Sequence, residues 1–325
     1  MPAIIIGSQS YNIVESLDSV TIADSFALIK LQTTRGHGEA KLYVGPQNTH
    51  TRNFFSNINA ECFFLKEDLI NYLSEAELEY ENPQQDYRKA TSQLRIEWAR
   101  YNSQAGTLRT DKRIFSITVF QDRQNRYYIR SSDNIFRFMR GIALPQISYL
   151  TILKLRDLAG TISYYFRLFL DTDYNTMNNR LAVEHAELEI SRDVSITVTE
   201  RKQLIKARIG QGVFRDGLLQ DFNQCPITGV TDKRILIASH IKPWFVSDNS
   251  EKLDHKNGLL LTPTYDRLFD RGLISFENDG TILISPYLSN SNRVKLNLAP
   301  NTQYNILPLG REAYLQYHRT HIFRA

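Results

Sequence analysis

Three residues in the last third of the chain combine types and spacing that suit hydrolysis. His240 offers an imidazole, Asn257 a side-chain amide and Asp266 a carboxylate. A neutral imidazole titrates near working pH and can take a proton from water. A carboxylate supplies the hard oxygen ligands that Mg²⁺ prefers, and an amide can hold a ring or a loop by hydrogen bonds. These groups match what phosphodiester hydrolysis needs, namely a base, a cation that neutralises developing charge and a group that orients the base.

The residues around this trio predict the elements that would bring it together. Two apolar runs typical of strands flank a polar loop, and a short helix follows the second run. In order, the segments are RILIASHI at 234–241, SDNSEKLDHKNG at 247–258, GLLL at 258–261 and PTYDRLFDRG at 263–272. His240 would end the first strand, Asn257 would begin the second and Asp266 would lie on the helix. This strand-loop-strand-helix unit would place all three at one point.

Patterns on either side extend the unit. Pro263 can begin the helix and Gly272 can end it. LISFENDGTILIS at 273–285 is typical of a hairpin with its turn at residues 278–280. Upstream, the apolar periodicity from Thr199 to Leu219 predicts a helix, with a break at Gly210 as an open alternative.

The stretch at 214–285 resembles the HNH endonuclease family. The resemblance rests on the order C…TG…AxHI.PW…NGL.L…LFD.G, and YLQYHRTHIF at 314–323 is similar to the closing helix of that branch. It implies a ββα-metal nuclease fold in which His240 is the general base and Asn257 the middle catalytic residue. Asp266 takes the place where the family often has its final histidine, a metal ligand. The chain would be an H-N-D version of the motif.

Two departures from the family pattern bear on metals. The residue before the base is usually Asp or His and binds metal, whereas here it is Ser239. The ion would then depend on Asp266 with waters, or on Asp270 one helical turn along the same face. Such an oxygen shell favours Mg²⁺ or Mn²⁺. Many members also carry two CxxC pairs around zinc, but here only Cys225 remains, with Thr228, Thr262 and Tyr265 at the other places, so we expect no structural zinc.

The distribution of charge singles out one further segment. The net charge is +4, but residues 88–140 hold twelve Lys/Arg and four Asp/Glu. Clustered cations gain affinity for phosphates by releasing condensed counterions, and the interleaved aromatic residues could stack on bases. The residues expected to contact DNA are Arg88, Lys89, Lys112, Arg113, Arg137, Arg140 and, beside the predicted site, Arg267. A solvated basic face is the alternative, and for Arg267 the choice between phosphate and solvent stays open.

Length and composition bound the whole chain. At 325 residues, 42% of them hydrophobic, it is long enough for two domains with ordinary cores. The most apolar run, 149–170, is interrupted by charges, and the N-terminus has no basic region before its apolar run. We therefore expect a cytoplasmic protein that does not insert in membranes. The two cysteines, Cys62 and Cys225, cannot form a disulfide framework.

The first part of the chain predicts a mixed α/β domain. Strands are expected up to residue 60, an amphipathic helix at 65–80, a hairpin from 114–120 and 126–130, and a buried helix after Pro145. A linker is expected to begin at 171–179. The expected architecture is α+β, with a DNA-recognition domain at 1–190 and an HNH nuclease domain at 191–325.

These observations lead to one expected function and two rivals. The expected function is a metal-dependent endonuclease that cuts double-stranded DNA to leave a 5′-phosphate and a 3′-hydroxyl. The recognition domain would make it a sequence-specific type II restriction enzyme, and cutting both strands would call for a homodimer. The first rival is a modification-dependent or other anti-phage HNH nuclease. The second is a non-catalytic DNA-binding protein whose site has decayed.

Overall fold

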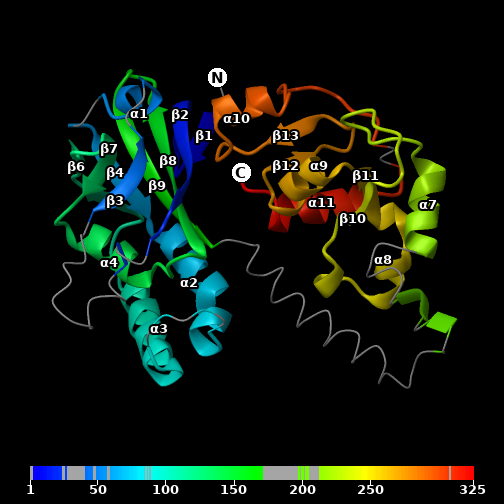
Figure 1. Cartoon of the computed structure of the whole chain (residues 1–325), viewed down its shortest axis with the longest axis horizontal. Coiled ribbons are helices and arrows are strands. Elements are labelled where there is room, and N and C mark those ends of the chain that lie inside the picture. The colour runs from blue at the N-terminus through cyan, green and yellow to red at the C-terminus, as the bar shows by residue number, and fades with distance from the viewer. Residues whose placement is uncertain are drawn as a thin grey trace. The chain divides into compact units, whose positions relative to one another are not determined.

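A computed structural model shows the chain as two compact units, Met1–Tyr174 and Asn175–Ala325 (Figure 1). The residues that the structure describes are 3–23, 26–27, 41–46, 49–56, 59–83, 85, 87, 89–170, 197, 199–200, 202–204, 212–306 and 309–325. Both units contain helices and strands, in agreement with the predicted α+β class. The predicted domain boundary at 190/191 and the predicted helix break at Gly210 lie outside the described residues.

The first unit is built on a six-stranded sheet in the order β1-β2-β8-β9-β4-β5. Its strands are β1 (Ala3–Ile6), β2 (Gln9–Thr21), β4 (Glu61–Leu65), β5 (Lys112–Phe115), β8 (Ser148–Arg156) and β9 (Ile162–Leu170). A second sheet has the order β3-β7-β6, with β3 (Leu42–Pro46), β6 (Thr118–Gln121) and β7 (Arg126–Arg130). The helices are α1 (Thr49–Phe54), α2 (Lys66–Glu81), α3 (Thr91–Gly106) and α4 (Asn134–Ile142).

The prediction of a buried helix after Pro145 is wrong. This segment forms β8 and β9, an antiparallel pair in the middle of the large sheet. Nearly all of their side chains are buried, because both strands lie inside the sheet and are covered on its two faces. A strand buried on both sides has a continuous apolar run, and periodicity alone does not separate it from a buried helix.

The predicted hairpin from residue 114 to 130 is correct only in its second half. β6 and β7 pair as expected, but residues 112–115 leave that hairpin and form β5, which pairs with β4 in the large sheet. The helix expected at 65–80 is confirmed as α2. Its repeat of buried residues, including Leu69, Tyr72 and Leu73, faces the core of the first unit.

The second unit confirms the predicted order of strand, loop, strand and helix. β10 (Ile237–His240) pairs antiparallel with β11 (Gly258–Leu261), and α9 (Pro263–Asp270) follows. Pro263 lies in the first turn of α9, and Gly272 follows its end with φ +64°. The predicted hairpin is β12 (Ile274–Phe276) with β13 (Ile282–Ile284). Around these lie α7 (Val213–Asp221), η2 (Trp244–Val246), α8 (Asn249–Leu253), η3 (His255–Asn257), α10 (Asn290–Lys295) and α11 (Glu312–His321).

The start of α11 is tied to the strand pair by a buried arginine. Arg311 has no solvent exposure, and its guanidinium donates 3.0 Å to the Gly258 carbonyl and 2.6 Å to the Asp221 carboxylate. It also lies over the Phe222 ring. The end of α7, the first residue of β11 and the last helix therefore meet at one side chain. No described helix of the chain is both long enough and apolar enough to cross a membrane.

Candidate active site

His240 is the last residue of β10 and lies opposite Gly258 in the strand pair. Its ring is partly exposed, and Nε2 lies 3.2 Å from the carbonyl oxygen of Lys252. A carbonyl can only accept, so Nε2 carries the proton and donates it. In this tautomer Nδ1 carries the basic lone pair of the ring. The carbonyl of Lys252 therefore sets both the orientation and the proton position of the imidazole.

Aromatic packing fixes the plane of the same ring. Phe214 on α7 stacks on His240 with centroids 3.8 Å apart and planes 4° from parallel. Trp244 meets it edge to face at 5.5 Å. Gly258 makes the stacking possible, because a Cβ at this position would lie 2.7 Å from the Phe214 ring. The imidazole is thus held on a preformed support before any substrate binds.

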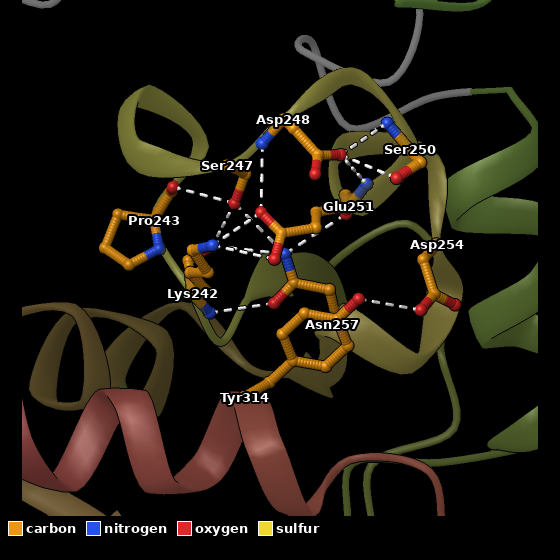
Figure 2. A network of polar contacts seen from close by, with 9 residues as sticks. All are labelled: Lys242, Pro243, Ser247, Asp248, Ser250, Glu251, Asp254, Asn257 and Tyr314. Carbon is orange, nitrogen blue, oxygen red and sulfur yellow. Dashed lines mark hydrogen bonds and ion pairs between the residues drawn. The ribbon is translucent and has the colours of Figure 1, made fainter.

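Asn257 is fully buried, and its amide points into the loop between β10 and β11 (Figure 2). Oδ1 accepts from the backbone N–H of Lys242 at 2.8 Å. Nδ2 lies within hydrogen-bond distance of the Lys242 carbonyl, the Glu251 carbonyl and the Ser247 hydroxyl, at 3.2, 3.1 and 3.4 Å. The Asn257 amide therefore joins the start of the loop, at Lys242, to its later part, at Glu251. Its geometry is that of a positioning residue, with its polar atoms turned toward the loop.

Further polar contacts stabilise the short helix α8 inside this loop (Figure 2). Asp248 caps its N-terminus by accepting from two backbone N–H groups, and Glu251 accepts from the Asp248 N–H in return. Such a capping box satisfies backbone donors that a helix start leaves unpaired. Lys242 forms an ion pair with Glu251, and Tyr314 on α11 donates to Asp254 at 2.9 Å. The loop is thus anchored to both its stem and the last helix.

A pair of carboxylates lies on α9, one helical turn apart. The side chain of Ser239 on β10 is buried against Asp266, close enough to lower the pKa of that carboxyl group, although its hydroxyl makes no hydrogen bond of normal geometry. Desolvation outweighs this effect and raises the pKa of Asp266 above its ordinary value. Desolvation and the Asp266 charge together raise the pKa of Asp270 to about 7, although part of Asp270 reaches solvent. Desolvation and the repulsion of Asp270 by Asp266 therefore disfavour ionising both carboxylates at once, and Arg267 offsets part of this effect at Asp270.

The structure groups the predicted site residues into two clusters on the same unit. His240 and Asn257 both contact the loop that contains α8, while Asp266 on α9 lies against Ser239, the neighbour of His240 on β10, and Asp270 follows one helical turn along α9. In the described part of the chain, no three His, Cys, Asp or Glu side chains gather at one point suited to an ion. The oxygen donors that the structure places near one another here are the two carboxylates and the Ser239 hydroxyl.

Comparison with known families adds the deciding observation. Residues 225–277 match the model of the HNH endonuclease family. The second unit carries an HNH endonuclease domain. The matched segment contains β10, the α8 loop, β11 and α9, and so includes His240, Asn257 and Asp266. No curated protein matches the chain.

Outside the HNH domain, the predicted DNA-binding residues fall into different environments. Lys89 is paired with Glu97, with side-chain exposures of 8% and 15%, and Arg140 is 8% exposed with its guanidinium over Phe26. Burial of both cations does not favour contact with DNA, and that role stays a prediction. Lys112 is half-exposed but paired with Glu61.

The remaining cations predicted to bind DNA lie in other surroundings. Arg113 and Arg137 line one pocket of the first unit. Arg267 lies on α9 in the HNH domain and is partly exposed. Arg88 lies outside the described residues. Among the described members of the predicted set, Arg113 and Arg137 thus share one pocket.

Sequence reasoning missed three contributors to the HNH domain site: Phe214, Gly258 and the carbonyl of Lys252. Phe214 is distant in sequence from His240, and no local pattern indicates the stacking. Gly258 directly follows Asn257 and begins the predicted strand at 258–261, and its φ of −153° is extended as that strand requires. The absence of a side chain opposite the predicted base was the available clue, since a glycine in a strand often marks a close approach.

Proposed function

We propose that the chain is a metal-dependent endonuclease that cuts double-stranded DNA, with His240 as the general base. The observation that carries the proposal is the imidazole at the end of β10, whose Nε2–H is engaged by the Lys252 carbonyl. This leaves the basic lone pair on Nδ1, the form that a general base requires. A non-catalytic DNA-binding protein with a decayed site would not be expected to hold the His240 ring by a hydrogen bond and two aromatic contacts.

The proposed reaction uses water as the nucleophile. Nδ1 of His240 takes a proton from the water, whose oxygen forms a bond to phosphorus while the bond from phosphorus to the 3′ oxygen breaks. The leaving oxygen takes a proton from solvent, and the products carry a 5′-phosphate and a 3′-hydroxyl. The charge that the imidazole gains is favoured by its contact with the Lys252 carbonyl dipole.

The residues near Ser239 fit a divalent cation. Asp266 and Asp270 offer two carboxylates whose pKa values are raised by desolvation, and at Asp270 also by the charge of Asp266, while the buried Ser239 hydroxyl lacks a normally placed partner. These are hard oxygen donors of the kind that suits Mg²⁺ or Mn²⁺. When bound, such an ion would neutralise charge on the phosphate and on the leaving oxygen.

Specificity is proposed to come from the first unit, because an HNH domain of this size offers few groups to base edges. A sequence-specific type II restriction enzyme, acting as a homodimer with one site per strand, is the form of the proposal that uses both units. A modification-dependent or other anti-phage nuclease is the alternative, in which the first unit reads a modified base or another signal.

Digestion of methylated and unmethylated phage DNA, with Mg²⁺ or with EDTA, tests the proposal. We expect cleavage only with Mg²⁺, and sequencing of the ends then gives the cut positions and end chemistry. Discrete fragments from unmethylated DNA support restriction, whereas cleavage of methylated DNA alone supports the alternative. Absence of cleavage in every metal and on every DNA contradicts the proposed activity.

The role of Asp266 is tested by its own variants. Asp266→Ala should be nearly inactive in Mg²⁺, while Asp266→His should keep some activity and shift its optimum toward Mn²⁺, Co²⁺ or Ni²⁺, because imidazole favours those ions. Normal cleavage by Asp266→Ala would make Asp270 the better ligand candidate.

A further inference from the structure

We infer that the first unit binds a nucleotide in a pocket between α3, β5 and α4, holding both its phosphate and its base. The pocket has a volume of about 450 Å³, within the usual range of small-molecule sites. Its walls come from the second half of α3, the turn after it, β5 and the first turns of α4. Because it lies wholly in the first unit, the inference does not depend on the nuclease activity proposed for the second.

Three guanidinium groups line the pocket, and no carboxylate of a described residue does. Arg100 comes from α3, Arg113 from β5 and Arg137 from α4. Nε of Arg113 is buried with no hydrogen-bond partner among the described residues, and Nη1 of the same side chain donates to the Thr110 hydroxyl at 3.3 Å. Arg137 is exposed and forms no ion pair with a described residue. Guanidinium forks match the oxygens of a phosphate in shape and charge.

The arginines of the pocket differ from the other cations of the basic segment. Three of those others are paired with acidic side chains, Lys89 with Glu97, Lys112 with Glu61 and Arg126 with Asp122. Asp133, the acidic residue nearest in sequence to the pocket wall on α4, does not line it and accepts from the Ser116 N–H instead. Three guanidinium groups of the basic segment thus share one pocket, and none of them forms an ion pair with a described carboxylate.

The rest of the wall is aromatic and apolar. Tyr101 and Phe138 meet edge to face with centroids 5.6 Å apart, and Leu108 and Ile135 lie beside them. The Tyr101 ring is fixed in place, because its hydroxyl packs where a Cβ of Gly141 would be, 2.4 Å away. Aromatic and apolar surface next to arginine is the combination that takes a base together with its phosphate.

The nucleotide could belong to a DNA strand, as a base turned out of its stack, or be a free mononucleotide. Both present the same chemistry to the pocket. The experiment therefore measures binding of the full chain, in EDTA, to the four deoxynucleoside 5′-monophosphates and to a labelled 20-base-pair duplex. Inorganic phosphate and deoxyadenosine are included as the two halves of dAMP.

Two variants at exposed positions test the pocket without disturbing the core. Arg137→Gln removes a guanidinium, and Gln104→Glu places a negative charge on the wall from α3. Arg123→Gln is the matched control, since Arg123 is an exposed arginine of the same unit that does not line the pocket. We expect each pocket variant to weaken mononucleotide binding at least about tenfold, the effect of losing one charged hydrogen bond, and the control to bind like wild type.

Competition between the probes separates the two sources. Displacement of the duplex by mononucleotides assigns the pocket to a nucleotide of the DNA strand, and binding without displacement assigns it to a free nucleotide. The inference is overturned if no mononucleotide binds, or if both pocket variants behave like Arg123→Gln. Binding of inorganic phosphate as tightly as dAMP would show that the base adds nothing to binding, and would overturn the part of the inference that places the base in the pocket. All of these readouts are independent of cleavage.

Discussion

His240 and Asn257 donate hydrogen bonds to consecutive backbone carbonyls at the end of α8, His240 to Lys252 and Asn257 to Glu251. The last carbonyls of a helix have no partner within it. Here the side chains of His240 and Asn257 donate to two of these carbonyls. The short helix α8 therefore holds both side chains in place. The orientation of the imidazole therefore depends on the loop that Asn257 closes.

This relationship separates the roles of the two residues. Asn257→Ala should lower the free energy of unfolding by about 2–3 kcal/mol, because it leaves several buried loop groups without partners, and should lower the cleavage rate as well. Thermal unfolding and plasmid nicking measure the two effects. His240→Ala is the comparison, and we expect it to lose activity while its melting temperature changes little. A stable but inactive Asn257→Ala would instead give the amide a direct part in the reaction.

The stacking of Phe214 on His240 gives a second prediction. Gly258→Ala should push the Phe214 ring aside and slow cleavage at least about tenfold, since misplacing a reacting group by a fraction of an ångström is expensive. Phe214→Leu should slow cleavage by a similar factor. Because both changes act through one ring contact, their effects should not add in the double variant. Fully additive losses in cleavage rate would show that Gly258 acts by another route.

The ion pair of Arg311 and Asp221 predicts a large effect on the stability of the fold. Asp221→Asn should lower the free energy of unfolding by about 3 kcal/mol, because Arg311 would remain buried without its carboxylate. Asp232→Asn is a matched control, since Asp232 pairs with Arg234 at the same 2.6 Å but Arg234 is 87% exposed. Chemical denaturation should show no measurable change for the control. Equal effects of the two variants would mean that burial of Arg311 does not matter.

His318 predicts a pH dependence of stability. Burial is the main cause that holds its pKa at about 3, below the ordinary 6.5. Nε2 donates to the Phe269 carbonyl, and Nδ1 accepts from Ser275. Below pH 6.5 the unfolded chain takes up a proton that the folded chain refuses, so stability falls as the pH drops toward 3 and is unaffected by this group above 6.5. At pH 5 the loss should be about 2 kcal/mol relative to neutral pH.

His318→Gln tests this assignment, because the glutamine amide can still donate to Phe269 but does not titrate. Denaturation of the variant at pH 7.5 and pH 5 should show a smaller difference than wild type. His321→Gln, on the exposed side of the same helix, should keep the wild-type difference. An unchanged pH dependence in His318→Gln would place the titrating group elsewhere.

The parts of the site that could be predicted are those with local causes. The strand-loop-strand-helix order followed from apolar runs and from Pro263 and Gly272, which act within a few residues of their own positions. The contact of Phe214 with His240 and the burial of Arg140 depend on packing between distant segments, which no local pattern contains. The strands after Pro145 were mistaken for a helix because burial on both faces removes the alternation that identifies a strand.

The central claim, that His240 is the general base of a metal-dependent nuclease, is tested most directly by nicking of supercoiled plasmid. The rate is measured for wild type and His240→Ala in Mg²⁺, Mn²⁺ and EDTA, with DNA binding measured in parallel in EDTA. We predict nicking by wild type only with metal, a loss of at least about 100-fold in His240→Ala, as expected for removal of a general base, and unchanged DNA affinity. Nicking by His240→Ala at a rate close to wild type would contradict the account.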